Sequence, residues 1–351
     1  MSEPRTSLTL QSVALPFLAL AAFTAFCYLA SPLLIPVVVS ISLAYILSPL
    51  VFLLNRLKIP HYLSVLLVLL VAIIVIALVS YLIIGQANSF VLQIPHYWNQ
   101  VISFLAKIEQ KLIDQGAFAP GQGPSVQDLQ LKNFTWLPQY LARGLSSLLS
   151  FVLGLVFVFF LTFFILNEYP SLKKRIIRAF GSSNEEISGK ILTEINEQIR
   201  GFVVVKFYVT IALSVIFTLG FMLLGVSYAY ILGPLAGVLS LVPYIGPLIG
   251  LVLPLLVTAI EFKAFLPVLW VFLFSQAIHQ TESNLVTPKL LENKINLNSL
   301  TILIASMFWA WLWGAIGIVL AVPITAAIKV VCDHVESLKP IGIILGGKKE
   351  E

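Results

Sequence analysis

Polar side chains gather in one short stretch that follows the apolar run Phe265–Ile278. On a helix, one face of this stretch carries amide and hydroxyl groups: Gln276, Gln280, Ser283 and Asn284. His279 and Glu282 lie three residues apart beside that face. Amides and hydroxyls can hydrogen-bond a polar solute, and a carboxylate near membrane depth can bind a proton or a cation. The alternative is that the apolar run simply ends, so that Glu282 lies in water on the outer side.

Proline and glycine residues interrupt a second apolar run, Ile231–Ile260. The interrupting residues are close neighbours: Pro243, Tyr244, Gly246 and Pro247. Because proline removes a backbone donor and clashes with the preceding turn, we expect the helix to break here. A half-helix beginning at Pro247 would point the positive end of its dipole at anionic or hydroxyl groups of a solute. The alternative is a static kink with close helix packing. The glycines expected to pack closely are Gly233, Gly237, Gly250, Gly314 and Gly317.

The sequence carries no motif of an enzyme or of an ATP-driven pump. Walker A, Gly-x-Gly-x-x-Gly, His-Glu-x-x-His, Gly-x-Ser-x-Gly and Cys-x-x-Cys patterns are all absent. The four histidines are scattered, and no two are spaced to share a metal or to serve a nucleophile. We therefore expect a protein that is not an enzyme, has no cofactor or metal, and moves something across a membrane or acts as an interaction partner within it.

The elements that must position these residues are membrane-spanning helices. Of the 351 residues, 59% are hydrophobic and only 11% are charged, and the mean hydropathy is +0.99. The long apolar runs are Val13–Ala30, Leu33–Leu54, Tyr62–Ile84, Leu145–Leu166, Val203–Gly225, Ile231–Ile260, Phe265–Ile278 and Leu300–Val331. Most of them are long enough to cross about 30 Å of hydrocarbon as helices. The predicted fold is an all-α, polytopic transmembrane helical bundle of about eight spans with broken helices.

The distribution of Lys and Arg predicts the orientation of this bundle. With the N-terminus in the cytoplasm, most of the 21 basic residues fall on the inner side, and both termini are cytoplasmic. This arrangement has Lys206 and Lys263 inside, with Lys289 and Lys294 outside. A net charge of +5 suits a protein beside anionic headgroups of an inner membrane, so we expect a lipid bilayer as partner and no nucleic acid.

The predicted organisation alternates membrane and non-membrane segments. Residues 1–84 contain three spans, 85–144 an extracytoplasmic segment, 145–166 the fourth span, 167–202 a cytoplasmic amphipathic helix segment, 203–331 four more spans, and 332–351 a cytoplasmic tail. Within the extracytoplasmic segment, apolar residues at three- and four-residue spacing predict an amphipathic helix over Pro95–Asp114. This helix could rest on the outer leaflet or on its own bundle, or act as a lid or subunit contact.

Four stretches form a recognisable set of motifs: Leu43–Leu50, Val242–Pro247, Glu282–Leu290 and Gly314–Pro323. Together they resemble the autoinducer-2 exporter family of PerM-like permeases. By this resemblance Pro243, Gly246 and Pro247 form a broken-helix element, and Glu282, Asn284 and Pro288 form a second element. Members of the family are described as exporters of the furanone-type signal autoinducer-2, and others as sodium or lithium to proton antiporters.

Three functions remain open at this stage. The first is export of a small polar solute along a path that contains both interrupted elements, with Glu282 as the group for ion or proton coupling. The second makes a monovalent cation the cargo, exchanged for protons at Glu282. The third is a membrane interaction or scaffold protein that transports nothing. The Gly-x-x-x-Gly pairs and the outer amphipathic helix also favour a homo-oligomer.

Overall fold

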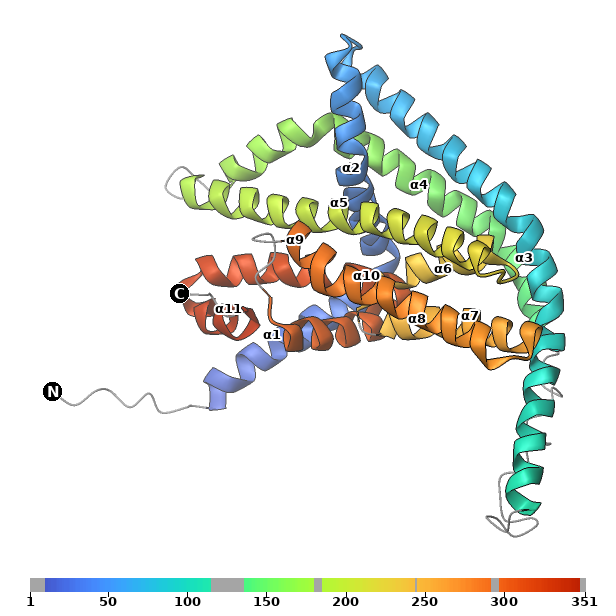
Figure 1. Cartoon of the computed structure of the whole chain (residues 1–351). Helices are drawn as coiled ribbons and strands as arrows, with labels where there is room; N and C mark the ends of the chain where they lie inside the picture. Colours follow the sequence, from blue (N-terminus) through green and yellow to red (C-terminus); the bar gives the residue numbers. More distant parts are fainter. Residues whose placement is uncertain (1–9, 115–135, 180–184, 244, 292–296, 348–351) are drawn as a thin grey trace. The chain divides into compact units, whose positions relative to one another are not determined.

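The computed structural model describes residues 10–114, 136–179, 185–243, 245–291 and 297–347, and these residues form helices joined by short links (Figure 1). The longer helices are α1 (Leu10–Leu29), α2 (Ser31–Arg56), α3 (His61–Asp114), α4 (Trp136–Ala179), α5 (Glu185–Leu223), α6 (Ala229–Leu239), α7 (Ile245–Phe262), α8 (Phe265–Thr281) and α10 (Ser299–His334). Shorter pieces follow α8 and α10: a π-helical turn (Glu282–Val286), α9 (Thr287–Leu291), a 3-10 turn (Glu336–Leu338) and α11 (Lys339–Leu345).

The prediction of an all-α polytopic membrane protein is confirmed. Six stretches of the described residues are long and apolar enough to cross a membrane, and α6 is a shorter apolar helix. The six are Ser31–Arg56, His61–Tyr81, Val152–Tyr169, Ser188–Leu223, Ile245–Phe262 and Ser299–His334. A helix satisfies its backbone hydrogen bonds internally, which is why apolar runs of this length adopt it in a bilayer.

We had predicted that the run Ile231–Ile260 forms one span. It forms instead an antiparallel hairpin of α6 and α7. A Cβ atom on Gly246 would lie 1.8 Å from the carbonyl oxygen of Leu239, so the chain folds back on itself at the break. The two outer ends also meet, because the Ser227 hydroxyl donates to a Glu261 carboxylate oxygen at 2.5 Å. The hairpin therefore begins and ends on the same side of the molecule.

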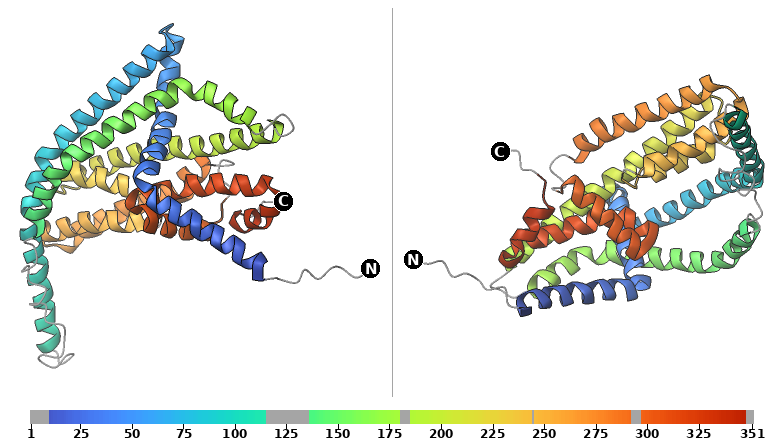
Figure 2. Two further views of the ribbon diagram at one scale, coloured as in Figure 1. Left: turned by 180° about the vertical axis from the view of Figure 1, so that it is seen from behind. Right: turned by 90° about the horizontal axis from the view of Figure 1, so that it is seen from below.

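A second reversal occurs within α10, which we had also predicted as one span. Gly314 has φ 63° and ψ −143°, a backbone conformation that is essentially restricted to glycine. A Cβ atom on Gly317 would lie 1.9 Å from the carbonyl oxygen of Trp309, whereas residues eight apart in a continuous helix are separated by about 12 Å. The course of α10 can be followed by its label in Figure 1 and by its colour in Figure 2.

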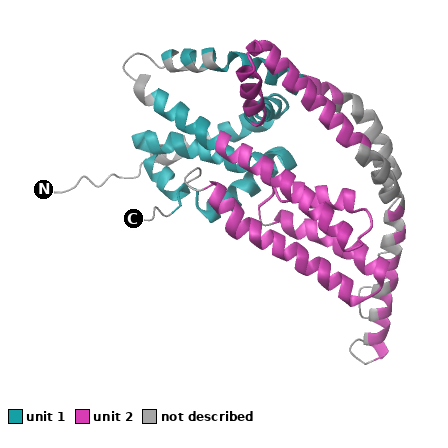
Figure 3. Ribbon diagram, turned by 45° about the horizontal axis from the view of Figure 1, so that its top comes forward, with its two compact units in different colours: residues 1–45, 157–199, 296–351 teal, residues 46–156, 200–295 magenta. Residues whose placement is uncertain are grey.

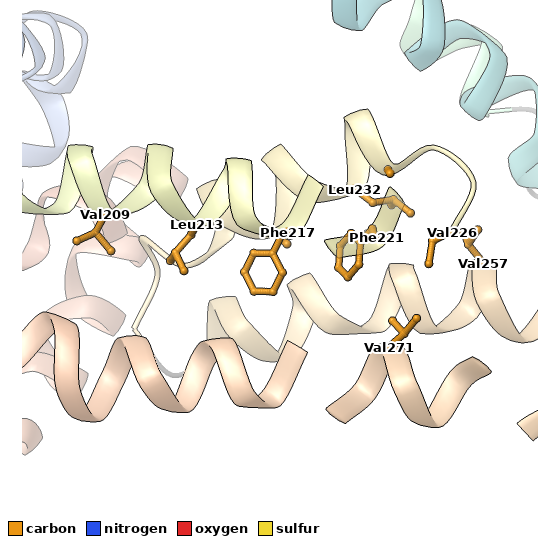
Figure 4. Packing of buried hydrophobic residues seen from close by; sticks show 10 residues of the cluster. Val209, Leu213, Phe217, Phe221, Val226, Leu232, Val257 and Val271 are labelled. Atoms are coloured by element: carbon orange, nitrogen blue, oxygen red, sulfur yellow. The ribbon is translucent and has the colours of Figure 1, made fainter. Parts of the chain in front are cut away.

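The chain divides into two compact units (Figure 3). Unit 1 comprises residues 1–45, 157–199 and 296–351, and unit 2 comprises residues 46–156 and 200–295. In unit 1, buried residues from both arms of α10 pack together, and the Trp313 indole nitrogen donates to the carbonyl oxygen of Cys27 at 3.0 Å. In unit 2, the core lies between α5, α6, α7 and α8, and Phe217 and Phe221 are fully buried in it (Figure 4).

The predicted amphipathic helix Pro95–Asp114 is the far end of α3. This helix has 54 residues and continues from the candidate span His61–Tyr81 to Asp114, which corresponds to a length of about 80 Å. His96, Lys107 and Gln110 lie on its exposed side. The segment is thus a direct extension of a membrane helix and not a separate helix.

Candidate functional site

Glu282 lies where α8 changes into a π-helical turn. The α-helical pattern ends at Thr281, the π turn covers Glu282–Val286, and α9 begins at Thr287. Such turns are rare and occur frequently at functional sites, because the extra residue redirects the side chains around it. The Glu282 residue is only 7% exposed, although its neighbours Thr281 and Ser283 are exposed.

Two side chains donate hydrogen bonds to the buried Glu282 carboxylate. The Lys206 ammonium group, from α5, donates to Glu282 Oε1 at 3.0 Å, and the Thr287 hydroxyl donates to the same oxygen at 2.5 Å. The Lys206 ammonium group also lies 3.5 Å from the Thr287 hydroxyl oxygen. The Lys206 and Glu282 side chains are 16% and 9% exposed, so the pair is largely removed from water. A buried charge of this kind is tolerated only with a partner.

This ion pair corrects the predicted topology. We had placed Lys206 on the inner side and the end of α8 on the outer side, yet the two ends are in contact. The physical reason is the α6–α7 hairpin, which returns the chain to the side where α5 ends, so that α8 runs antiparallel to α5. Lys289 therefore lies at the same end as Lys206, and Lys263 lies at the opposite end, beside the link between α5 and α6. Lys294 is outside the described residues.

The polar face predicted on α8 divides between two environments. His279 is buried with its ring 5.0 Å from the Phe217 ring of α5. Gln276 is half-buried, whereas Gln280, Asn284 and Pro288 are exposed. The Asn284 amide donates to the Gln280 side-chain oxygen at 2.7 Å. The structure thus brings His279 and Glu282 together against α5 and leaves the amides of Gln280 and Asn284 on another face.

The proline and glycine element forms the tip of the α6–α7 hairpin. Pro243 lies in the link between the helices, Gly246 and Pro247 lie in the first turn of α7, and Tyr244 is outside the described residues. The Gly246 amide donates to the Val242 carbonyl oxygen at 3.1 Å, which closes the tight link. The tip is therefore an end of an antiparallel hairpin and not a kink within a single span.

The glycines of α6 and α7 set how closely the hairpin packs. A Cβ atom on Gly233 or Gly237 would lie 2.2 Å from the hydroxyl oxygen of Thr218 or Ser214, both on α5. A Cβ atom on Gly250 would lie 3.3 Å from the Ala236 Cα atom, within the hairpin itself. Only glycine lets α6 approach the α5 backbone this closely.

The register of these contacts brings the two predicted elements to one section of α5. Gly233 lies opposite Thr218 and Gly237 lies opposite Ser214, so α6 runs along α5 in the direction of Thr210 as it approaches the hairpin tip. The same section of α5 carries Lys206, the partner of Glu282. The α6 helix therefore leads toward the same section of α5 that contacts the end of α8.

Sequence reasoning missed the partners of Glu282. We used Lys206 only as a topology marker, although it is a lone lysine between Val205 and Phe207 in an apolar stretch, which is itself a sign of function. Thr287 could not be found from the sequence, because its contact depends on the π turn. Among the described residues, no group of three or more His, Cys, Asp and Glu side chains is arranged to hold a metal ion.

Comparison with known proteins gives a consistent result over nearly the whole chain. The sequence profile described as AI-2E family transporter matches residues 17–337. A putative transport protein of Borreliella burgdorferi is 25% identical over 90% of this chain and 84% of its own length. The AI-2 transport protein TqsA of Escherichia coli is 24% identical over 92% of each chain. The putative permease PerM of Escherichia coli is 26% identical over 86% of this chain and 87% of its own length.

Proposed function

Because the chain belongs to the AI-2E transporter family, we propose that this multi-pass membrane protein is a secondary transporter that exports a small polar solute of the autoinducer-2 type. The observation that carries the proposal is the buried Lys206–Glu282 pair between α5 and α8, beside the predicted polar segment. The name of one relative, AI-2 transport protein, supports the class of solute.

The Lys206–Glu282 pair suits ion coupling because each charge is neutralised by the other through a contact that an ion can replace. When Lys206 neutralises Glu282, the carboxylate tolerates burial. A proton or a monovalent cation that binds Glu282 would replace Lys206 as the compensating charge. The lysine would then be released from α8, and the α5–α8 contact would change with the occupancy of the site. Solute movement can thus be linked to ion movement at one carboxylate.

The same observation favours one alternative cargo. If Glu282 itself carries sodium or lithium in exchange for protons, the solute is not needed, and the protein is a cation antiporter. Rescue of salt-sensitive cells that requires the Glu282 carboxylate would identify this case. Solute efflux that requires the same carboxylate would identify the exporter.

We propose an inner-membrane location with both termini in the cytoplasm and assembly as a homo-oligomer. Each of the two reversals, at the α6–α7 link and at Gly314, returns the chain to the side from which it came, so their effects on the side of the C-terminus cancel. The C-terminus therefore keeps the side that the charge distribution predicts. In this proposed topology Lys289 is assigned to the inner side, which is rich in positive charge, and Lys263 to the outer side.

Efflux from reconstituted vesicles tests the proposed function. We expect liposomes that contain the purified protein to release trapped autoinducer-2 faster than protein-free liposomes do. The Glu282→Gln variant should lower this rate by about tenfold or more, because it removes the charge that couples the two movements. The matched control is Glu197→Gln, at an exposed glutamate of α5. Equal efflux from wild-type and protein-free vesicles would contradict transport. A Glu282→Gln variant that retains the wild-type efflux rate would contradict the role of the carboxylate.

A further inference from the structure

Helix α4 continues beyond the end of its candidate membrane span. The span covers Val152–Tyr169, whereas α4 ends at Ala179, so residues 170–179 extend the same helix past it. Pro170 stands at the junction, and a proline inside a helix typically kinks it. We expect the extension to begin where the hydrocarbon core of a bilayer gives way to the headgroup region.

The stretch that includes this extension is strongly basic. Residues 169–184 contain four basic residues and no aspartate or glutamate, so their formal charge is +4. The basic residues are Lys173, Lys174, Arg175 and Arg178. Lys174, Arg175 and Arg178 are exposed. Their positive charge is therefore available to a partner outside the protein.

The exposed residues of the extension form a surface with a basic and an apolar side. Arg178 follows Lys174 by four residues and Arg175 by three, and these spacings place side chains on one face of a helix. Leu172 precedes Lys174 by two residues, which places it on a different face, and it is 47% exposed. We call Leu172, Lys174, Arg175 and Arg178 the basic end of α4.

A bilayer that carries anionic headgroups fits both sides of this surface. Arginine and lysine side chains bind phosphate oxygens with charge-assisted hydrogen bonds. Basic clusters that directly follow a membrane-spanning helix lie within reach of the headgroups and are attracted by their negative charge. The Leu172 side chain would be covered by lipid at the same boundary, whereas a free phosphate ion would leave it in water.

We propose that the basic end of α4 binds the phosphodiester groups of anionic lipids. The partner is thus a lipid surface, recognised by its negative charge together with the apolar layer beneath it. The inference concerns a lipid ligand and not the cargo, so it stands whether or not the protein transports autoinducer-2.

Photo-crosslinking in nanodiscs tests where the anionic lipid binds. The full-length protein is placed in phosphatidylcholine nanodiscs that contain photoreactive phosphatidylglycerol, or photoreactive phosphatidylcholine as the neutral probe. Cleavage after Glu168 and Glu185 releases the basic stretch as one peptide in every variant, because residues 169–184 contain no glutamate. We expect phosphatidylglycerol to label this peptide about tenfold more than phosphatidylcholine does.

Variants that remove charge separate specific binding from general contact with lipid. The Lys174→Gln, Arg178→Gln variant should lower phosphatidylglycerol labelling of the peptide about tenfold or more, because each basic residue near a membrane surface contributes about fivefold to binding. The matched control is Lys107→Gln, Lys111→Gln, which removes two exposed lysines at the same four-residue spacing from α3. It should leave the labelling unchanged. Equal labelling by the two lipid probes, or undiminished labelling of the Lys174→Gln, Arg178→Gln variant, would overturn the inference.

Thermal unfolding in detergent separates a lipid site from a site for free phosphate. Phosphatidylglycerol should raise the melting temperature of the wild type more than that of the Lys174→Gln, Arg178→Gln variant. The shift should shrink as salt is raised, because ions screen exposed charges. If inorganic phosphate stabilises the wild type as much as phosphatidylglycerol does, the basic end of α4 is a site for small anions and the inference is wrong. A loss of efflux with lipid binding intact would reject only the proposed transport function.

Discussion

At the residue scale, the burial of Lys206 and the burial of Glu282 each depend on the opposite charge of the other residue. Each would be an uncompensated charge between packed helices without the other, and Thr287 adds a hydrogen bond to the same carboxylate oxygen. The sequence predicts Glu282 as a candidate because carboxylates at the ends of apolar runs are costly. It does not predict the partner, since the two residues are 76 positions apart and no local signal indicates the contact.

Replacing Lys206 with methionine should destabilise the protein more than replacing both members of the pair. The single variant leaves a buried carboxylate without a cation, a change that typically costs about 3–5 kcal/mol. The Lys206→Met, Glu282→Gln double variant removes both charges and should recover most of that loss. Thermal unfolding in detergent measures the difference, with Lys107→Met on the exposed side of α3 as control. A double variant that is less stable than Lys206→Met would argue against the pair.

At the element scale, the two hairpins show what the sequence could and could not predict. The proline and glycine break near Pro243 was predictable from local chemistry, and the structure does break the helix there. The reversal was missed because an apolar run has the same composition whether it crosses the membrane once or folds back. The length of each apolar run was the signal that could have revealed the reversal. The runs 231–260 and 300–331 would extend about 45 and 48 Å as single helices, well beyond the hydrocarbon core.

Close packing of α6 on α5 makes Gly237 intolerant of a large side chain. Gly237→Leu would drive its side chain into Ser214, including the backbone nitrogen 2.7 Å from the added Cβ atom. We expect the variant to lose monodisperse folded protein on size-exclusion chromatography. Gly154→Leu in α4 is the control, because no atom lies within 4 Å of a Cβ atom there. Equal profiles for the two variants would contradict the packing described for the hairpin.

The reversal in α10 predicts a second backbone effect. Gly314 has a positive φ, and open space surrounds the position of a Cβ atom, so strain and not a clash would limit substitution. Gly314→Ala should lower stability by about 1–3 kcal/mol. Thermal unfolding against the Gly154→Ala control measures it. An unchanged melting temperature would mean that the chain does not need this conformation.

At the scale of the whole molecule, we expect the hairpins to change which loops face which side of the membrane. Lys263 and Lys289 are both exposed, and the structure puts them at opposite ends of α8. In a background without Cys27 and Cys332, Lys263→Cys should react with a membrane-impermeant maleimide in intact cells. Lys289→Cys should react only after permeabilisation. The reverse pattern would support eight single crossings and contradict the hairpin topology.

The proposed transport mechanism couples movement of a solute to an ion at the Lys206–Glu282 pair. Its most direct test records the internal pH, and separately the internal sodium, of proteoliposomes while an imposed autoinducer-2 gradient drives flux. The wild type should move protons or sodium whenever the solute moves, and Glu282→Gln should move neither ion. Solute flux through the wild type without any accompanying proton or sodium movement would contradict the account.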